Sequence, residues 1–158
     1  MNVQLKNKQK GFTIIEVVLV LAIAGLIFLM VFIALPALQR NQRDTQRKND
    51  LSRAQTAINN YQSNNRGALP GTDNGAWNGF AGSYLRAGGD TFSDPARGDY
   101  TMQVSNAASD TLTFPNDSAP VYVSLNSTCD GENIAGAGNR KVALRIKLEG
   151  GGVACVNN

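Results

Sequence analysis

The sequence predicts an α+β fold, in which a long N-terminal hydrophobic α-helix forms a stalk and packs on a small C-terminal antiparallel β-sheet. Two observations lead to this prediction. An apolar run followed by an amphipathic, polar stretch extends to about residue 65, and from residue 100 the hydrophobic period changes to the alternation typical of strands. As one helix, residues 12–65 would be about 80 Å long, which is too long for one small domain.

The run from Val17 to Leu35 contains no charged or strongly polar side chain. As a helix it would span about 28 Å, close to the hydrocarbon thickness of a bilayer. A secretory signal peptide has a shorter apolar region that ends in a small-x-small site, which this run lacks. A simple one-pass anchor would account for the run but not for Gly11 and Phe12 before it. Nor would it explain the carboxylate of Glu16, because a charge in lipid is costly.

These residues resemble a known family. The segment KGFTIIEVVLVLAIAG, at residues 10–25, resembles the class III signal and N-terminal helix of type IV pilins and pseudopilins, which carry an N-terminal methylation motif. The resemblance implies that prepilin peptidase cuts between Gly11 and Phe12 and that the new N-terminus at Phe12 is methylated. It also implies that Glu16 is the acidic residue that takes part in assembly.

Two residues weaken the predicted helix. Gly25 costs about 1 kcal/mol relative to Ala, and Pro36 costs about 3 kcal/mol and removes a hydrogen bond. In many type IV pilins the segment between such a Gly and a Pro melts in the filament. Gly25 matches the position in the family, whereas Pro36 lies a few residues later than is usual. Melting between the two residues and a simple kink at Pro36 both remain open.

Four segments are expected: a leader at 1–11, a transmembrane and assembly helix at 12–38, an amphipathic continuation of that helix at 39–66, and a globular pilin domain at 67–158. The continuation is expected to end at Gly67 and Pro70 and to pack on the sheet through Leu51, Ala54, Ala57, Ile58 and Tyr61. Its first part, Gln39–Asp50, is highly charged and offers the i,i+4 pairs Arg40–Asp44 and Asp44–Lys48. This part is either solvated near the membrane or in contact with neighbouring subunits.

The globular part begins with a long connection at 69–99 that is rich in Gly, Asp, Asn and Ser. An ordered loop is expected there, pinned to the core by Trp77, Phe80, Tyr84, Leu85 and Phe92, although its tip could instead be a binding surface. Alternation predicts strands around 100–104, 112–114, 121–125, 142–148 and 153–156, with a turn at Glu149-Gly150-Gly151-Gly152. In 142–148 the even-numbered residues are expected to face one way and the odd-numbered ones the other. This pattern resembles the pilin fold.

The formal net charge is +3, from 15 Lys and Arg against 12 Asp and Glu. Lys6, Lys8 and Lys10 lie in the leader, and 15 minus these 3 leaves 12 basic against 12 acidic side chains. The basic character therefore belongs to the leader and argues against nucleic acid as a partner. The leader lysines also predict a cytoplasmic N-terminus and a C-terminal part outside the inner membrane.

The chain has two Cys, at 129 and 155, and no His. In an exported domain this favours one disulfide between Cys129 and Cys155, with two free thiols as the alternative. Zinc is not expected, since no further Cys or His could complete its ligands, and without His the usual general base is missing. The run Asp130–Asn133 could hold Ca²⁺, but turns have the same composition, so no metal or other cofactor is predicted. Asn116 and Asn126 begin N-glycosylation sequons.

The sequence therefore predicts a structural subunit and not an enzyme. The first hypothesis is a pilin, major or minor, of a type IV pilus (a fimbrium) that serves adhesion, twitching motility or DNA uptake. Its expected partners are further copies in a helical homopolymer, prepilin peptidase, the pilus assembly platform, and the membrane before assembly. The precursor would lie in the cytoplasmic membrane and the assembled subunit in an extracellular pilus. The alternatives are a pseudopilin of a type II secretion or competence system and a monomeric membrane-anchored binding domain.

Overall fold

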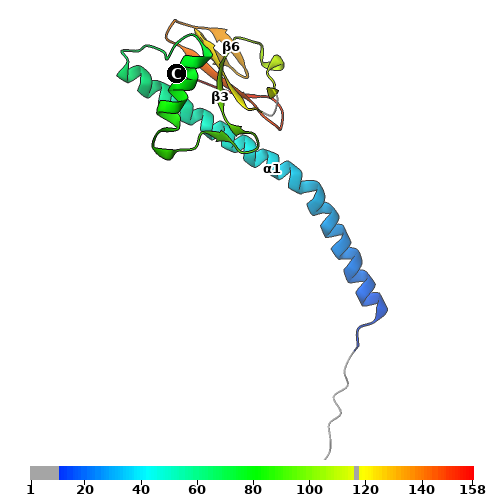
Figure 1. The fold of residues 1–158 in the computed structure, drawn as a ribbon. Coiled ribbons are helices and arrows are strands. Elements are labelled where there is room, and N and C mark those ends of the chain that lie inside the picture. Colours follow the sequence, from blue (N-terminus) through cyan, green and yellow to red (C-terminus); the bar gives the residue numbers. More distant parts are fainter. Residues whose placement is uncertain (1–10, 116–117) are drawn as a thin grey trace, which may run out of the picture. The chain divides into compact units, whose positions relative to one another are not determined.

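Helix α1 runs from Ile14 to Asn64 in the computed structural model, which describes residues 11–115 and 118–158 (Figure 1). The leader lysines and the sequon at Asn116 lie outside this range. The predicted long helix is confirmed, and Pro36 lies inside it. Beyond its end, Arg66 and Gly67 adopt positive φ angles of 55° and 81°, and the Gly67 N–H donates to the carbonyl oxygen of Gln62 at 2.7 Å. This is the usual hydrogen bond of a helix C-terminus closed by glycine.

The chain divides into two compact units, one up to Leu38 and one from Gln39 to Asn158. The second, here called the globular unit, contains the C-terminal part of α1, whose side chains at three- and four-residue steps are buried as predicted. They are Leu51, Ala54, Ala57 and Ile58, and Tyr61 is partly buried beside them. This part of α1 is therefore held by tertiary packing, which supplies most helical stability in proteins.

The central sheet has four strands in the order β3-β4-β7-β8. The strands are β3 (Thr101–Val104), β4 (Pro120–Leu125), β7 (Val142–Lys147) and β8 (Val153–Asn157). The pairs β4–β7 and β7–β8 are antiparallel, but β3 and β4 are parallel, with Met102 opposite Val121. The α+β class is confirmed, and the expectation of antiparallel pairing throughout is wrong at this edge. The 15-residue connection between β3 and β4 returns the chain to the same end of the sheet, as parallel pairing requires.

One face of the sheet packs against α1 in a single hydrophobic core. The even-numbered residues Val142, Leu144 and Ile146 of β7 lie in this core, as the alternation predicts. Val121 and Val123 of β4 join them. Each such buried aliphatic side chain contributes about 1.5–3 kcal/mol relative to exposure.

The opposite face of the sheet is covered by the segment between β3 and β4. The strand predicted at 112–114 is absent: Ser109–Thr111 form a 3₁₀ turn, and the following residues pair with no strand. The Tyr122 hydroxyl donates to the carbonyl oxygen of Thr113 at 2.9 Å, while Leu112 packs with Tyr122 and Val153. Leu112 and Phe114 therefore alternate with polar residues in a segment that packs across the sheet and is not itself a strand.

The connection at 69–99 is ordered, as expected, but it contains a helix that the sequence did not predict. Helix α2 spans Asn74–Phe80 and is capped by Asp73, whose side chain accepts from the Ala76 N–H. A helical turn (Ala81–Leu85), a 3₁₀ turn (Ala87–Gly89) and the short strands β1 (Ser93–Asp94) and β2 (Gly98–Asp99) follow. The large side chains of this segment are buried at Trp77, Phe80, Leu85 and Phe92.

Helix α2 also closes the edge of the sheet. The Asn78 side-chain amide accepts from the Met102 N–H and donates to the Met102 carbonyl, each at 2.9 Å. One turn earlier, the Asn74 side chain accepts from the Val104 N–H at 2.7 Å. These bonds occupy the outward N–H and carbonyl of Met102 and the N–H of Val104, which would otherwise be open to pairing with another chain.

A separate hairpin, β5 (Ser127–Asp130) and β6 (Asn133–Gly136), follows the turn at Asn126. No strand was expected in this region from the sequence. The hairpin brings Cys129 close to β8, where the second Cys lies.

Candidate functional site

The N-terminal segment from Gly11 to Leu38 is the first candidate site. The Thr13 N–H and hydroxyl both donate to the Glu16 carboxylate at 2.8 Å, and the Glu16 N–H donates to the Thr13 hydroxyl at 3.3 Å. This reciprocal pattern is a capping box, which satisfies N–H groups at the start of a helix. In the uncut chain, Glu16 therefore caps the start of α1 together with Thr13. The Thr-x-x-Glu spacing in the sequence is the signal that could have predicted this role.

The expected cleavage position lies just before this capped start. Gly11 and Phe12 are outside the helix and exposed, and the Phe12 side chain is 89% exposed. An exposed, non-helical peptide bond is the kind of backbone that a peptidase can bind.

The apolar surface of this segment is uncovered over its whole length. Every large apolar side chain from Phe12 to Leu38 is exposed, and the least exposed of them, Leu35, is still 45% exposed. The helix is long and apolar enough to cross a membrane by its length and composition. Soluble monomers rarely leave so large an apolar surface in water, so it indicates contact with lipid or with other protein.

The second candidate site is a cluster of buried charges in the globular unit, centred on Arg47. Its guanidinium binds Asp94 through two bonds, Nε–Oδ2 at 2.5 Å and Nη2–Oδ1 at 2.9 Å. It also donates to Asp44 at 2.9 Å and to Glu149 at 2.8 Å. The side chains of Arg47 and Asp94 are completely buried.

Two further arginines complete this group, which we call the Arg47 cluster (Arg43, Asp44, Arg47, Asp94, Arg97 and Glu149). Arg43 donates to Glu149 from Nη2 at 2.6 Å and from Nε at 2.9 Å, and Arg97 donates to it at 3.0 Å. The Phe114 ring lies 4.0 Å from the guanidinium carbon of Arg97 and 5.2 Å from that of Arg47. Three positive and three negative side chains therefore balance one another.

The cluster joins three segments that are far apart in the sequence. Asp44 lies on α1, Asp94 on β1, and Glu149 in the turn between β7 and β8. Asp44 also accepts from the backbone N–H groups of Glu149 and Gly150 at 2.8 and 2.7 Å. The charged stretch 39–50 was expected to be either solvated or in contact with neighbouring subunits. Instead, Asp44 and Arg47 are buried inside their own subunit.

The hydrogen bonds of the cluster determine its protonation. Burial alone would raise the pKa of Glu149, but the bonds from Arg43, Arg47 and Arg97 lower this pKa to about 2. Burial alone would lower the pKa of Arg47, yet its bonds to Asp94 and Glu149 outweigh that effect and raise it. All members of the cluster that show these shifts are charged at neutral pH.

The lowered pKa of Glu149 predicts that the cluster loses stability in acid. An unfolded Glu titrates at about 4.3, so the contribution of Glu149 is fully present above that pH and is lost as the pH falls from about 4 toward 2. We expect Glu149→Gln to be less stable than wild type at pH 7 and the difference to shrink steadily below pH 4. Urea unfolding of both proteins at several pH values measures it. A difference that stays constant down to pH 2.5 would contradict this assignment.

Comparison with known proteins bears on the N-terminal segment. Residues 6–32 match the family model described as the prokaryotic N-terminal methylation motif. The chain carries a type IV pilin-like class III signal. No curated protein and no solved structure matches the chain. The class III signal is a structural, pilin-type motif, and it implies processing by prepilin peptidase and a membrane-anchored precursor.

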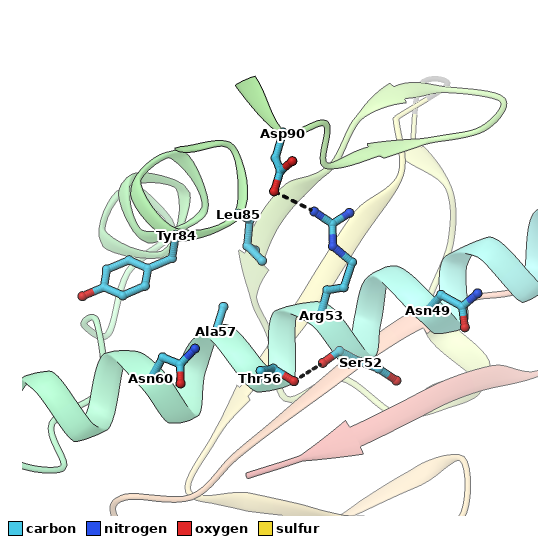
Figure 2. Close-up of a pocket in the computed structure, with 9 residues that line it drawn as sticks. All are labelled: Asn49, Ser52, Arg53, Thr56, Ala57, Asn60, Tyr84, Leu85 and Asp90. Atoms are coloured by element: carbon cyan, nitrogen blue, oxygen red, sulfur yellow. Dashed lines mark hydrogen bonds and ion pairs between the residues drawn. The ribbon is translucent and has the colours of Figure 1, made fainter. Parts of the chain in front are cut away.

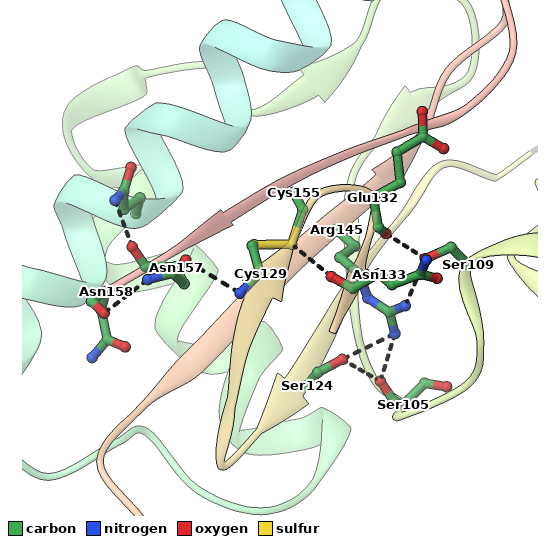
Figure 3. Close-up of a disulfide and its surroundings, with 11 residues drawn as sticks. Ser105, Ser109, Ser124, Cys129, Glu132, Asn133, Arg145, Cys155, Asn157 and Asn158 are labelled. Carbon is green, nitrogen blue, oxygen red and sulfur yellow. Dashed lines mark hydrogen bonds between the residues drawn. A yellow bond between two sulfur atoms is a disulfide. The ribbon is translucent and has the colours of Figure 1, made fainter. Parts of the chain in front are cut away.

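A disulfide joins Cys129 to Cys155 in the chain that carries this signal (Figure 3). It links the β5–β6 hairpin to the edge strand β8. The bond is the pairing that the sequence favoured. Beside it, the Asn157 side chain accepts from the Cys129 N–H at 3.2 Å.

We expect Cys129→Ser to lower the stability of the globular unit by about 3 kcal/mol, because the loop closed by the bond contains some 27 residues. Reduction of the wild-type protein should have a similar effect. Thermal unfolding followed by circular dichroism measures both. Reduced and oxidised wild type melting at the same temperature would contradict the prediction.

Arg145 is a buried charge that the sequence placed on the far face of β7. It is fully buried, and its bonds go to the hydroxyl of Ser124 at 3.0 Å, the hydroxyl of Ser109 at 3.4 Å and the carbonyl oxygen of Ser105 at 3.4 Å (Figure 3). Its Nε has no hydrogen-bond partner. Burial lowers the pKa of Arg145. The arrangement holds the segment after β3 against the sheet, which explains why the odd-numbered face of β7 is also covered.

The run Asp130–Asn133 forms the turn of the β5–β6 hairpin. Its Glu132 accepts from the Val153 N–H at 3.2 Å, so this carboxylate serves the neighbouring strand. Among residues 11–115 and 118–158, no group of three or more His, Cys, Asp or Glu is placed to hold a metal ion. The Asp, Gly, Glu and Asn of this run are thus explained by its place in a hairpin turn.

Proposed function

We propose that this chain is a filament subunit, the pilin of a type IV pilus, which is cut between Gly11 and Phe12 and polymerises through residues 12–38. One observation carries the proposal: the class III signal leads directly into a helix whose large apolar side chains are all exposed as far as Leu38. A helix in lipid satisfies its backbone N–H and carbonyl groups with its own hydrogen bonds, so the precursor is stable in the membrane before assembly. Assembly then exchanges contact with lipid for contact with other copies of the helix.

In this proposal each site residue has a separate role. Cleavage removes residues 1–11 and leaves a cationic, methylated amine on Phe12. Glu16 balances that charge in the apolar bundle. Gly25 and Pro36 weaken the helix locally, which lets the segment between them adjust to its neighbours. Residues 39–66 and the domain at 67–158 form the outer part of the subunit, and the disulfide stabilises that part outside the cell.

The same signal and helix would also serve a pseudopilin of a type II secretion or competence system. The two differ in their product: a pilus is a stable surface fibre used for adhesion, twitching motility or DNA uptake, whereas a pseudopilus stays within the cell envelope. The decisive experiment is to shear cells that express the chain, image the released material by electron microscopy, and identify its subunit by mass spectrometry. Fibres that contain the chain with Phe12 as its first residue support a pilin. A mature N-terminus at any other residue would refute the proposed cleavage.

Replacing Gly11 by Leu should block cleavage, because prepilin peptidase requires a small residue before the cut. The precursor would then keep its leader lysines, and burial of those charges in an apolar bundle is too costly for assembly. We expect intact precursor in the membrane fraction and no fibres. The mass of the membrane-bound chain measures this, and Gly11→Ala is the matched control that should still be processed. Equal processing of the Leu and Ala variants would rule out this role for Gly11.

A further inference from the structure

A polar groove runs between α1 and the segment that follows α2, within the globular unit (Figure 2). It has a volume of about 440 Å³, within the range of ligand sites. One wall is formed by successive turns of α1, from Asn49 to Asn60, and the other by Tyr84, Leu85 and Asp90. The wall on α1 is about 16 Å long, since each residue adds 1.5 Å.

Tyr84 is the feature that distinguishes this groove from an ordinary solvated surface. Among the described residues of the globular unit, it is the one large apolar side chain that is exposed, at 36%. Its ring stacks on Phe80 with centroids 5.3 Å apart and meets the Tyr61 ring edge-on at 5.4 Å. The exposed aromatic is therefore held in one orientation before any ligand arrives, which reduces the entropy lost on binding.

The polar side chains on the α1 wall of the groove can still form hydrogen bonds with a ligand. The side-chain amides of Asn49 and Asn60 make no hydrogen bond within the described part of the chain, and in Figure 2 they flank the groove. The hydroxyls of Ser52 and Thr56 donate to carbonyl oxygens one turn earlier, so their oxygens remain able to accept. The groove thus offers both donors and acceptors along one line.

The charges of the groove cancel. Arg53 and Asp90 lie 3.7 Å apart and are 43% and 76% exposed, so they form a loose pair with no net charge. Neither an anion nor a cation is favoured by such a pair. A protein partner would need a larger apolar centre than one tyrosine, because binding energy at protein interfaces concentrates in buried aromatic and apolar anchors.

A saccharide fits all of these features. Its ring has an apolar C–H face that can pack on a fixed aromatic, and its hydroxyls both donate and accept, as amides and serine or threonine hydroxyls require. We propose that this groove binds a neutral oligosaccharide, with Tyr84 as the stacking platform and Asn49 and Asn60 as hydrogen-bonding residues. This binding function goes beyond the proposed filament function and does not depend on it.

The test uses the full-length chain, isotope-labelled, in micelles of a zwitterionic detergent without a sugar headgroup. Maltotriose, cellotriose and chitotriose are titrated separately, and amide chemical shifts are followed by NMR. We expect at least one trisaccharide to shift the side-chain amides of Asn49 and Asn60 in a saturable way. Tyr84→Ser and Asn60→Ala should each weaken that binding at least tenfold.

Asn59→Ala is the matched control, since Asn59 is the neighbouring exposed amide on α1 but does not line the groove. It should bind like wild type. The proposal is overturned if none of the three sugars causes saturable shifts, or if Asn60→Ala and Tyr84→Ser bind as well as Asn59→Ala. It is also overturned if the groove signals respond only to unlabelled copies of the chain, because the occupant would then be a second subunit. Whether Tyr84→Ser still forms fibres is measured separately, because fibre formation tests the filament proposal and not sugar binding.

Discussion

Replacing Arg47 by Met should destabilise the globular unit by about 3–5 kcal/mol, the usual cost of removing one partner from a buried ion pair. The loss leaves the carboxylates of Asp94, Asp44 and Glu149 without their shared positive charge, and their side chains are only 0%, 11% and 13% exposed. A total stability of 5–15 kcal/mol is typical of a domain, so this one change could remove most of it. The effect comes from the stranded charges rather than from lost packing.

Urea unfolding of the full chain, followed by the fluorescence of Trp77, measures this loss. Trp77 is the only Trp and is completely buried in the globular unit, so its emission reports on that unit. Lys48→Met is the matched control: Lys48 is the neighbouring cation on α1, it is exposed, and it makes no ion pair with another described residue, so its loss should matter by less than about 1 kcal/mol. Equal unfolding midpoints for the two variants would contradict the role of the cluster.

A double variant separates charge from packing. If Arg47→Met is destabilised because Asp94 has lost its counter-charge, then Asp94→Leu in the same chain should recover part of the loss. Replacing both members of a buried pair by apolar groups is often close to neutral. A double variant less stable than Arg47→Met would show that Asp94 contributes mainly through its bond to the Ala96 N–H.

Replacing Glu16 by Ala should leave membrane insertion and cleavage intact but strongly reduce incorporation into filaments. In the proposed filament, the amine that cleavage creates on Phe12 lies in an apolar bundle, where an unpaired charge is costly. Glu16 lies four residues on, so it can reach the amine of its own chain or that of a neighbour. Loss of one partner of such a pair costs about 3–5 kcal/mol, which corresponds to a factor of more than a hundred in incorporation.

The experiment expresses tagged mutant and wild-type chains together and compares their ratio in sheared fibres with that in the membrane. The capping box adds a control, because Glu16 also accepts from the Thr13 N–H. Glu16→Gln keeps an oxygen that can cap the helix but removes the charge. If charge balance is what matters, both variants are excluded from fibres; if only the cap matters, Gln is incorporated and Ala is not. If Glu16→Ala is incorporated into fibres as efficiently as wild type, Glu16 is needed for assembly neither as a charge partner nor as a helix cap.

The regular elements of this fold were predictable because their side chains repeat. Leu51, Ala54 and Ile58 recur at helical steps, and Val142, Leu144 and Ile146 alternate, so the long helix and strand β7 follow from periodicity alone. Helix α2 was missed because its sequence, NGAWNGF, contains two glycines and too few residues to show a period. It is held by Asp73 at its start and by the bonds of Asn74 and Asn78 to β3, which no local pattern reveals.

The buried charges could not be predicted for a different reason. Arg47 and Arg145 look like ordinary surface arginines in the sequence, because Arg is almost never fully buried unless it is paired. One partner of Arg47, Asp44, is three residues away, but the other two lie 47 and 102 residues away along the chain. Only the tertiary fold brings them together. By contrast, the class III signal could be recognised in the sequence, because it is a short, contiguous motif.

The span of the Arg47 cluster also has a consequence for the order of folding. The carboxylate of Glu149 is made 102 residues after Arg47, and β7, which holds β4 and β8 together, is made shortly before it. At about 5–20 residues per second, roughly 5–20 s pass between the synthesis of Arg47 and that of Glu149, and the sheet stays incomplete during that time. Long-range contacts of this kind also form slowly, because a large loop must close first. The globular unit therefore cannot complete the Arg47 cluster or its central sheet until the turn between β7 and β8 has emerged.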